Sequence, residues 1–139
     1  MTSCPIQTNQ VSTPSARVLI AEDDRVTRNA ARVALQLDGY LVAEAADGPT
    51  VLEILEAEPP DVLLLDLDLP GISGISLLAE IAQRKLAVPM IIIMTAYRES
   101  GLAGDLMRLG ANGLLRKPLA AADLRLRVRT VLEERSVLH

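Results

Sequence analysis

Three short apolar runs, each ending at polar residues, constrain the fold of this chain more than any other feature. They are residues 18–21 before Glu22-Asp23-Asp24, residues 62–65 before Asp66, and residues 90–94 before Thr95. From residue 17 onward, short apolar runs alternate with longer segments of helical period, which is the pattern of a parallel sheet with crossover helices. Because the carboxyl ends of neighbouring parallel strands lie at one edge of a sheet, these polar residues should converge there.

Composition excludes several classes of protein. The 139 residues, half of them hydrophobic, suit one domain that buries about two-thirds of its unfolded surface. The formal charge is −4, and there is no Phe, no Trp and only two tyrosines, so we expect no direct nucleic-acid binding. The apolar runs are far shorter than the roughly 20 residues of a membrane span, and the N-terminus lacks a signal-peptide pattern. We therefore expect a soluble, cytoplasmic protein that contacts no membrane.

The chain divides into a leader, a domain and a short tail. Residues 1–15 are rich in Ser, Thr, Pro, Asn and Gln, which predicts a disordered leader. Cys4 lies in this leader and is the only cysteine, so no intramolecular disulfide and no cysteine zinc cluster can form. The domain is expected over residues 16–136, with a tail at 137–139.

The order of elements predicts an α/β fold. We expect a doubly wound (βα)₅ flavodoxin-like sandwich whose five-stranded parallel sheet has the order 2-1-3-4-5. Strands are expected at residues 18–21, 40–45, 62–65, 90–94 and 113–116. Helices are expected between Asp24 and Gly39, between Asp47 and Pro59, at residues 73–84 and 98–109, and after the Lys117-Pro118 turn.

Apolar residues at helical spacing support each helix. The recurring positions are Val26, Ala30, Val33 and Leu37 in the first, Val51, Leu52, Ile54 and Leu55 in the second, Leu77, Leu78 and Ile81 in the third, and Leu124, Val128, Val131 and Leu132 in the last. The fourth helix contains Gly101 and Gly104, each of which costs up to about 1 kcal/mol relative to Ala. It should therefore be the weakest helix.

The convergence of Asp23, Asp24 and Asp66 predicts a magnesium site. Carboxylates in one pocket repel each other unless a cation compensates, and Mg²⁺ prefers hard oxygen ligands while retaining waters. The three aspartates contribute −3, Lys117 contributes +1 and Mg²⁺ contributes +2, so the total is zero. Asp66 could then stay ionised and accept a phosphoryl group, whose oxygens Lys117 and the Thr95 hydroxyl would neutralise.

Each of these residues also has an ordinary structural explanation. Asp24 could cap the first helix, Thr95 could simply end a strand, and Lys117-Pro118 could form an exposed turn. Asp68 could be a loop acid without a role. Their joint placement after successive apolar strands favours a shared site over these separate explanations.

This arrangement resembles the receiver (CheY-like) domain of bacterial two-component response regulators over residues 16–135. The resemblance rests on residues 18–24, on Asp66-Leu67-Asp68-Leu69-Pro70-Gly71-Ile72-Ser73-Gly74, on Met94-Thr95-Ala96 and on residues 110–118. It implies that Asp66 is the phosphoacceptor, that Asp23, Asp24, Asp66 and the Asp68 backbone carbonyl bind Mg²⁺, and that Thr95 and Lys117 hold the phosphoryl group. It also implies a cis peptide bond before Pro118, which proline tolerates at modest cost.

One position departs from the family pattern. Leu114 stands where the family usually has Tyr or Phe, three residues before the lysine. Leucine cannot hydrogen-bond or fill a ring-sized space, so we expect phosphorylation to be read out mainly through the weak fourth helix. Asp68 should add negative charge at the rim of the pocket and tune dephosphorylation or metal affinity. The resemblance makes Leu114, Ala96, Asp68 and Pro118 the switch or modulatory positions.

The expected function is that of a single-domain response regulator or phosphorelay shuttle, a signalling phosphoacceptor rather than an enzyme. Its partners would be a sensor histidine kinase or histidine phosphotransfer protein and a downstream protein target. A homodimer through the fourth and last helices stays open, since Leu102, Leu106 and Leu109 suit a core equally well. Two alternatives also stay open: a haloacid-dehalogenase-like phosphatase, whose acidic pair should however follow the lysine, and a non-phosphorylated pseudo-receiver scaffold.

Overall fold

The computed structural model describes residues 16–88, 90–96 and 100–138. The expected leader with Cys4, and the expected start of the fourth helix at Arg98, lie outside these residues. The strands are β1 (Arg17–Ala21), β2 (Leu41–Ala45), β3 (Val62–Asp66), β4 (Met90–Thr95) and β5 (Gly113–Arg116). The helices are α2 (Arg25–Leu37), α3 (Gly48–Ala57), α4 (Gly74–Arg84), α5 (Ser100–Arg108) and α6 (Ala121–Leu138).

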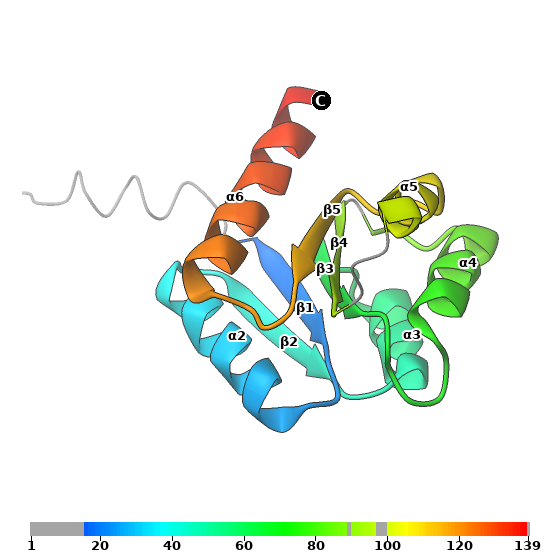
Figure 1. Cartoon of the computed structure of the whole chain (residues 1–139), viewed down its shortest axis with the longest axis horizontal. Coiled ribbons are helices and arrows are strands. Elements are labelled where there is room, and N and C mark those ends of the chain that lie inside the picture. The colour runs from blue at the N-terminus through cyan, green and yellow to red at the C-terminus, as the bar shows by residue number, and fades with distance from the viewer. Residues whose placement is uncertain (1–15, 89, 97–99, 139) are drawn as a thin grey trace, which may run out of the picture.

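The predicted topology is confirmed. The five strands form one sheet in the order β2-β1-β3-β4-β5, and every neighbouring pair is parallel. Helices α2 and α6 cover one face of the sheet, while α3, α4 and α5 cover the other (Figure 1). The order reverses at β1, which lies between β2 and β3, so the carboxyl ends of β1 and β3 border the crevice where this class of fold binds ligands.

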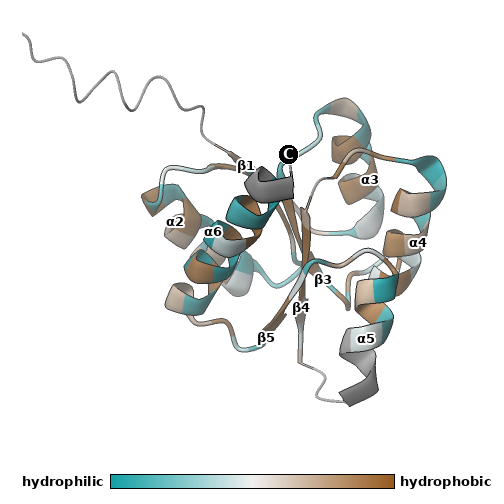
Figure 2. Ribbon diagram, turned by 90° about the horizontal axis from the view of Figure 1, so that it is seen from above, coloured by the Kyte–Doolittle hydropathy of each residue, from teal (hydrophilic) through white to brown (hydrophobic). Residues whose placement is uncertain are grey.

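Alternating side chains of the strands fill two cores. On β1, Leu19 and Ala21 point into the core under α3 and α4, whereas Val18 and Ile20 point into the core under α2 and α6. The strands are hydrophobic, and in α3 and α4 the hydrophobic residues lie on the side toward the sheet (Figure 2). Among the described residues, no helix combines the length and the apolar character that a membrane crossing requires.

Helix α2 forms where expected, but the apolar residues that predicted it do not face the core. Val26 is 77% exposed and Leu37 is 76% exposed, and Ala30 and Val33 are also exposed. The buried residues are instead Ala31, Ala34 and Leu35. Apolar residues occupy more than one side of this helix, so their spacing predicts a helix without fixing which side is buried. The small side chains of the two alanines suit the side that packs against the sheet and α6.

The loop after Asp66 is held by close backbone approaches. The Gly74 N–H donates to the Leu67 carbonyl at 2.8 Å, and a Cβ at Gly74 would lie 2.6 Å from the Leu67 Cα. The Gly48 N–H donates to the Pro70 carbonyl at 3.1 Å, and a Cβ at Gly48 would lie 2.8 Å from the Ile72 Cβ. The N-termini of α3 and α4 therefore clamp this loop next to the carboxyl edge of β3.

The remaining helices follow the predicted pattern with small differences. Leu124, Val128 and Val131 of α6 are fully buried and Leu132 is partly buried. Helix α6 continues to Leu138, two residues past the expected end of the domain at residue 136. In α5, Leu106 is buried.

Candidate functional site

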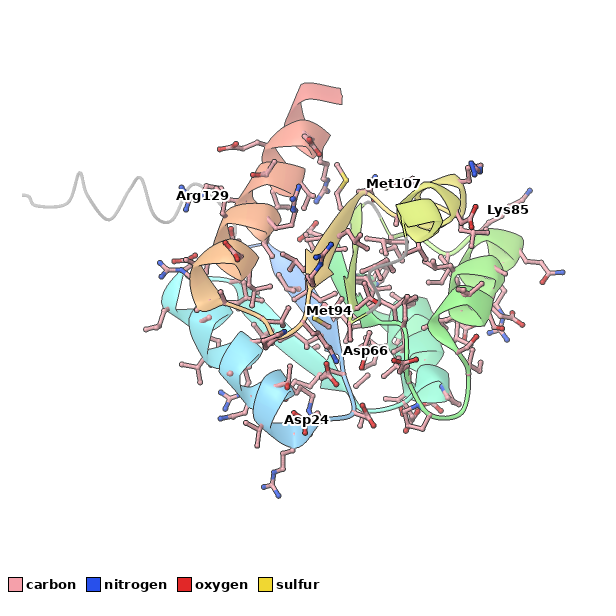
Figure 3. All side chains as sticks on the ribbon, in the orientation of Figure 1. Asp24, Asp66, Lys85, Met94, Met107 and Arg129 are labelled. Carbon is pink, nitrogen blue, oxygen red and sulfur yellow. The ribbon has the colours of Figure 1, made fainter. Side chains whose placement is uncertain are left out.

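Four strand ends bring the candidate residues to one edge of the sheet. Asp66 ends β3 and Thr95 ends β4, and both side chains are buried, with 3% and 2% of their surface exposed. The register pairs Asp66 with Met94 and Thr95 with Arg116, so the residue after β5, Lys117, comes level with these ends. The Lys117 N–H donates to the Thr95 carbonyl at 2.9 Å. Figure 3 shows Asp66 between the side of the molecule that carries α2 and the side that carries α3.

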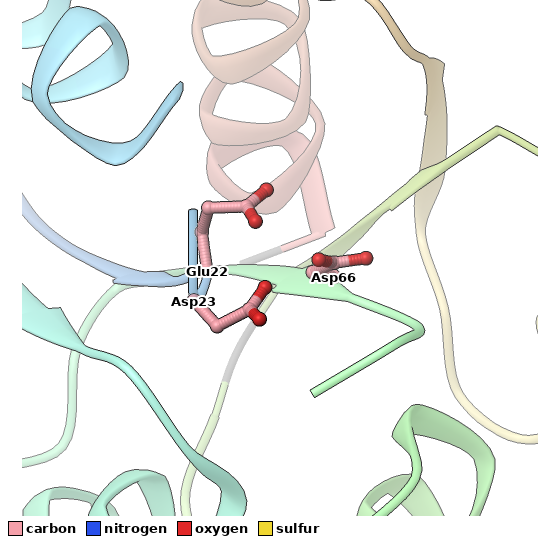
Figure 4. Close-up of side chains that lie close together, drawn as sticks. All are labelled: Glu22, Asp23 and Asp66. Carbon is pink, nitrogen blue, oxygen red and sulfur yellow. The ribbon is translucent and has the colours of Figure 1, made fainter. Parts of the chain in front are cut away.

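The acidic cluster consists of Glu22, Asp23 and Asp66. Each offers one carboxylate oxygen within 4.8 Å of the other two. Figure 4 shows the Glu22 and Asp23 side chains, from the turn after β1, beside the Asp66 carboxylate of β3. Glu22 is almost completely buried, with 1% of its surface exposed, whereas Asp23 is exposed.

Asp24, the third expected carboxylate, lies outside the cluster. It is the N-cap of α2, and its Oδ2 accepts from the Thr27 N–H at 2.9 Å and from the Thr27 hydroxyl. These hydrogen bonds lower the pKa of Asp24. The sequence analysis expected Asp23 and Asp24 beside Asp66, whereas the cluster that the structure brings together contains Glu22 in place of Asp24. The burial of Glu22 was the missing signal, and it follows from β1 ending at Ala21 so that residue 22 still lies at the edge of the sheet.

Lys117 links the two buried carboxylates. Its Nζ lies 3.0 Å from Asp66 Oδ2 and 2.6 Å from Glu22 Oε1. Burial alone would lower the pKa of Lys117, but the short contacts with Glu22 and Asp66 outweigh burial and raise it. The ammonium therefore stays protonated in the site. The peptide bond between Lys117 and Pro118 is cis, as the resemblance implied.

The cluster fits a divalent cation by its charge and its hydrogen bonding. Burial raises the pKa of Glu22, partly offset by Lys117 and by the Asp24 N–H, which donates to Oε2 at 3.0 Å. Glu22 Oε1 accepts no well-directed hydrogen bond from the described residues, although the ammonium lies within ion-pair distance. Three carboxylates against one ammonium leave excess negative charge in the cluster, and a hard cation such as Mg²⁺ would compensate it through the carboxylate oxygens.

The loop after Asp66 forms the other wall of the site. The Asp68 N–H donates to Asp66 Oδ1 at 3.1 Å, while Lys117 contacts the other oxygen, Oδ2, so both oxygens of the Asp66 carboxylate are fixed. An open pocket lined by Asp23 and residues 67–73 adjoins the cluster, and the exposed Asp68 lies on its rim.

The positions that the resemblance marked as modulatory lie around the same edge. Ala96 is exposed directly after β4. Leu114, in β5, pairs in register with Ile93 and packs partly buried against the core under α4 and α5. Pro118 and Lys117 line a groove together with Val26, Ala30 and Leu119.

Comparison with known proteins identifies the same pattern. A family model, the response regulator receiver domain, matches residues 18–129. The chain is 40% identical over 116 residues to the transcriptional regulatory protein CseB of Streptomyces coelicolor. The aligned region covers 83% of this chain and 48% of that protein. It is 36% identical over 109 residues to the transcriptional regulatory protein PdtaR of Mycobacterium tuberculosis, covering 78% and 52%. The chain thus spans about half the length of these curated relatives.

A solved structure agrees in fold. The response regulator receiver domain protein (CheY-like) from Methanospirillum hungatei superimposes with a TM-score of 0.83 and 25% identity, covering 91% of this chain and all of that one. The family match spans β1 through the first half of α6 and includes the acidic cluster, Thr95 and Lys117. The chain therefore belongs to the receiver-domain family of response regulators.

Proposed function

We propose that this protein is a cytoplasmic signalling module in which Asp66 accepts a phosphoryl group from a histidine kinase or a histidine phosphotransfer protein. The observation that carries the proposal is the environment of Asp66, a buried carboxylate that contacts the Lys117 ammonium at 3.0 Å and belongs to a cluster with Glu22 and Asp23. Phosphorylation would change the surface that a downstream protein recognises, which requires a bias of only a few kcal/mol between two conformations.

The site residues supply the chemistry of acceptance. A carboxylate oxygen of Asp66 forms a bond to phosphorus while the bond from phosphorus to the donor's imidazole nitrogen breaks, and the electron pair stays on that nitrogen. The Lys117 ammonium and the Thr95 hydroxyl neutralise charge on the phosphoryl oxygens. Glu22, Asp23 and Asp66, with the Asp68 carbonyl by resemblance, would hold Mg²⁺, which supplies the positive charge that the cluster and the phosphoryl oxygens need.

The protein would catalyse only its own phosphorylation and dephosphorylation. The phosphatase alternative needs an acidic pair after the lysine, and the acids that follow Lys117, namely Asp123, Glu133 and Glu134, are exposed on α6. The acidic pair that lies in the site precedes Asp66 in the chain. Turnover of an aryl phosphate would instead support the phosphatase.

Mass spectrometry after acetyl phosphate treatment tests the proposal. Wild type should gain one phosphoryl group in the presence of Mg²⁺ and lose most of the labelling when Mg²⁺ is chelated. Asp66→Asn should stay unlabelled, because an amide is a poor nucleophile. Labelling of Asp66→Asn to the level of wild type would exclude Asp66 as the acceptor. No labelling of wild type would favour the pseudo-receiver scaffold.

We infer that the phosphodonor contacts the exposed side of α2. We call Val26, Ala30, Val33 and Leu37 the α2 stripe, and its first two members line the groove that also includes Lys117. A phosphodonor protein must bring its phosphohistidine to Asp66, so the rest of its surface must contact this protein next to the site. The α2 stripe is an exposed apolar surface that borders the site, which suits such a contact. Val33→Glu should slow phosphotransfer from purified candidate kinases yet leave acetyl phosphate labelling unchanged.

A matched control exists on the opposite face. Ile75 of α4 is 47% exposed, and Val33 is 44% exposed, so Ile75→Glu introduces a similar charge at a similarly exposed position. Ile75→Glu should leave both reactions unchanged. Equal phosphotransfer rates for Val33→Glu and wild type would contradict docking on the α2 stripe.

We further propose that phosphorylation is read out through α5. Leu114 cannot provide the hydrogen bond or the ring of the usual aromatic residue, and it packs against the same core as Leu106 of α5. Amide hydrogen exchange over residues 100–108 should change when a phosphoryl mimic is added. Unchanged exchange there would contradict this readout.

Asp68→Asn should also change the dephosphorylation rate, since the exposed Asp68 lies on the rim of the pocket beside Asp66.

A further inference from the structure

The backbone of the acidic turn is held from two sides. The Glu22 N–H donates to the Ala45 carbonyl of β2 at 3.0 Å. The Glu22 carbonyl accepts from Nη1 of Arg28 at 2.8 Å, and the same nitrogen lies 3.4 Å from the Asp23 carbonyl. One guanidinium of α2 therefore bridges the consecutive carbonyls of the two residues that contribute carboxylates from this turn.

Arg28 is itself held in place. Its Nε donates to Glu44 Oε1 at 3.0 Å, and only 19% of its side chain is exposed. Glu44 lies on β2 and pairs in register with Ile20 of β1, so the Arg28 side chain is held by a residue of the sheet. The planar guanidinium offers several donors in a fixed geometry, which lets one side chain reach a carboxylate and two carbonyls at once. Arg32 Nε also lies 3.5 Å from Glu44, on the other carboxylate oxygen, but its hydrogen bonds to the described residues go to side-chain amide oxygens and not to a backbone carbonyl.

We propose that Arg28 is a positioning residue that presets the Asp23 carboxylate for a divalent cation. This inference rests on the proposed function, because it assumes that the acidic cluster holds Mg²⁺. Asp23 is exposed, so the direction of its side chain depends on the backbone of the turn rather than on packing. Mg²⁺ requires near-octahedral ligands at about 2.0–2.1 Å, so a backbone rotation that moves Asp23 would weaken binding. Outer-sphere partners of metal ligands typically contribute about 10–100-fold to metal affinity.

The sign of the effect separates positioning from simple electrostatics. Loss of the Arg28 charge would make the surroundings more negative, which by itself favours a cation. Loss of positioning weakens binding instead. Arg28→Ala should therefore raise the Mg²⁺ dissociation constant about tenfold, measured by isothermal titration calorimetry with MgCl₂ on the full chain. Arg32→Ala removes a charge near the same Glu44 and leaves the carbonyl bridge intact, so its dissociation constant should equal that of wild type or be lower.

Two further measurements complete the test. Arg28→Lys keeps the positive charge but loses the planar guanidinium with its several donors, so it should also bind Mg²⁺ more weakly than wild type. This variant replaces Arg28→Ala if Arg28→Ala fails to fold. A merely structural role would lower the melting temperature of the metal-free variants and leave the dissociation constant unchanged. Equal Mg²⁺ affinity for wild type, Arg28→Ala and Arg28→Lys would overturn the positioning role alone. Absence of Mg²⁺ binding by wild type would overturn the metal site of the proposed function and this inference with it.

Discussion

Neighbouring residues of one type can have unrelated roles, and the acidic turn after β1 shows why. Glu22 lies against Lys117 and Asp66 inside the site, Asp23 faces the cluster from its exposed side, and Asp24 caps α2. The difference follows from where β1 ends and where α2 begins, since the residue before a helix aims its side chain at the first N–H groups. A carboxylate that accepts from the Thr27 N–H and hydroxyl is directed away from the cluster.

Paired variants of this turn should separate capping from metal binding. Asp24→Ala should lower the melting temperature, because the first turn of α2 loses its cap, and leave the Mg²⁺ dissociation constant close to that of wild type. Asp23→Ala should weaken Mg²⁺ binding by at least about tenfold with little change in melting temperature. Thermal unfolding and calorimetric titration of both variants give the comparison. A large loss of Mg²⁺ affinity in Asp24→Ala would restore the ligand set expected from the sequence.

At the scale of elements, the two glycines Gly74 and Gly104 differ in whether the packing of their helix requires them. Gly74 allows α4 to start against the loop that follows Asp66, because a Cβ there would collide with the Leu67 backbone. Gly104 has no such role, since a Cβ there would meet only the Arg108 guanidinium at 3.8 Å or more. The sequence marked the helix containing Gly104 as weak, and the contacts of Gly104 show that this weakness is not required by packing.

Two glycine-to-alanine variants should therefore have opposite effects. Gly104→Ala should stabilise the protein by up to about 1 kcal/mol and slow amide exchange in α5, because alanine restricts the unfolded chain and favours the helix. Gly74→Ala should destabilise it by about 1–3 kcal/mol, since the loop must move to admit a methyl group. Urea denaturation with hydrogen exchange measures both effects. Destabilisation by Gly104→Ala would mean that α5 needs this glycine for a contact beyond Arg108.

At the scale of the whole molecule, ion pairs far from the site tie the ends of the fold together. Asp61, before β3, accepts from the Arg17 N–H at 2.8 Å and from Arg135 Nη1 of α6 at 2.5 Å. Arg125 of α6 makes a bidentate contact with Asp38 at the end of α2, at 2.6 and 2.9 Å. These contacts anchor α6 to β1 and to α2. They therefore hold together the layer of helices to which the α2 stripe belongs.

The contacts of Asp61 predict a pH-dependent contribution to stability. Burial would raise the pKa of Asp61, but the Arg17 N–H and Arg135 outweigh burial and lower it. A carboxyl group whose pKa is lower in the folded than in the unfolded state stabilises the fold at any pH above its unfolded-state pKa, which is about 3.9 for Asp. This stabilisation is lost as the pH falls through the folded-state pKa. Asp61→Asn should thus be about 1 kcal/mol less stable than wild type near neutral pH, with the difference shrinking below about pH 4.

Urea denaturation at several pH values checks this prediction. Asp105→Asn is the control, because Asp105 makes an exposed ion pair with Arg108 within one helix and should contribute little at any pH. A difference between wild type and Asp61→Asn that stays constant from neutral to acidic pH would show that the contribution of Asp61 does not come from its charge.

The amino-acid sequence by itself determined the order of strands and helices, the identity of the phosphoacceptor candidate and the edge of the sheet at which it lies. These features are local, because short apolar runs, helical spacing and turn residues act within a few positions of each other. Tertiary structure alone decided which side of α2 is buried, which acidic residues share the cluster and what holds their backbone. Those features depend on groups far apart in the chain, such as Lys117 beside Asp66 or Arg28 between Glu22 and Glu44, and such contacts exist only once the sheet has brought the strand ends together.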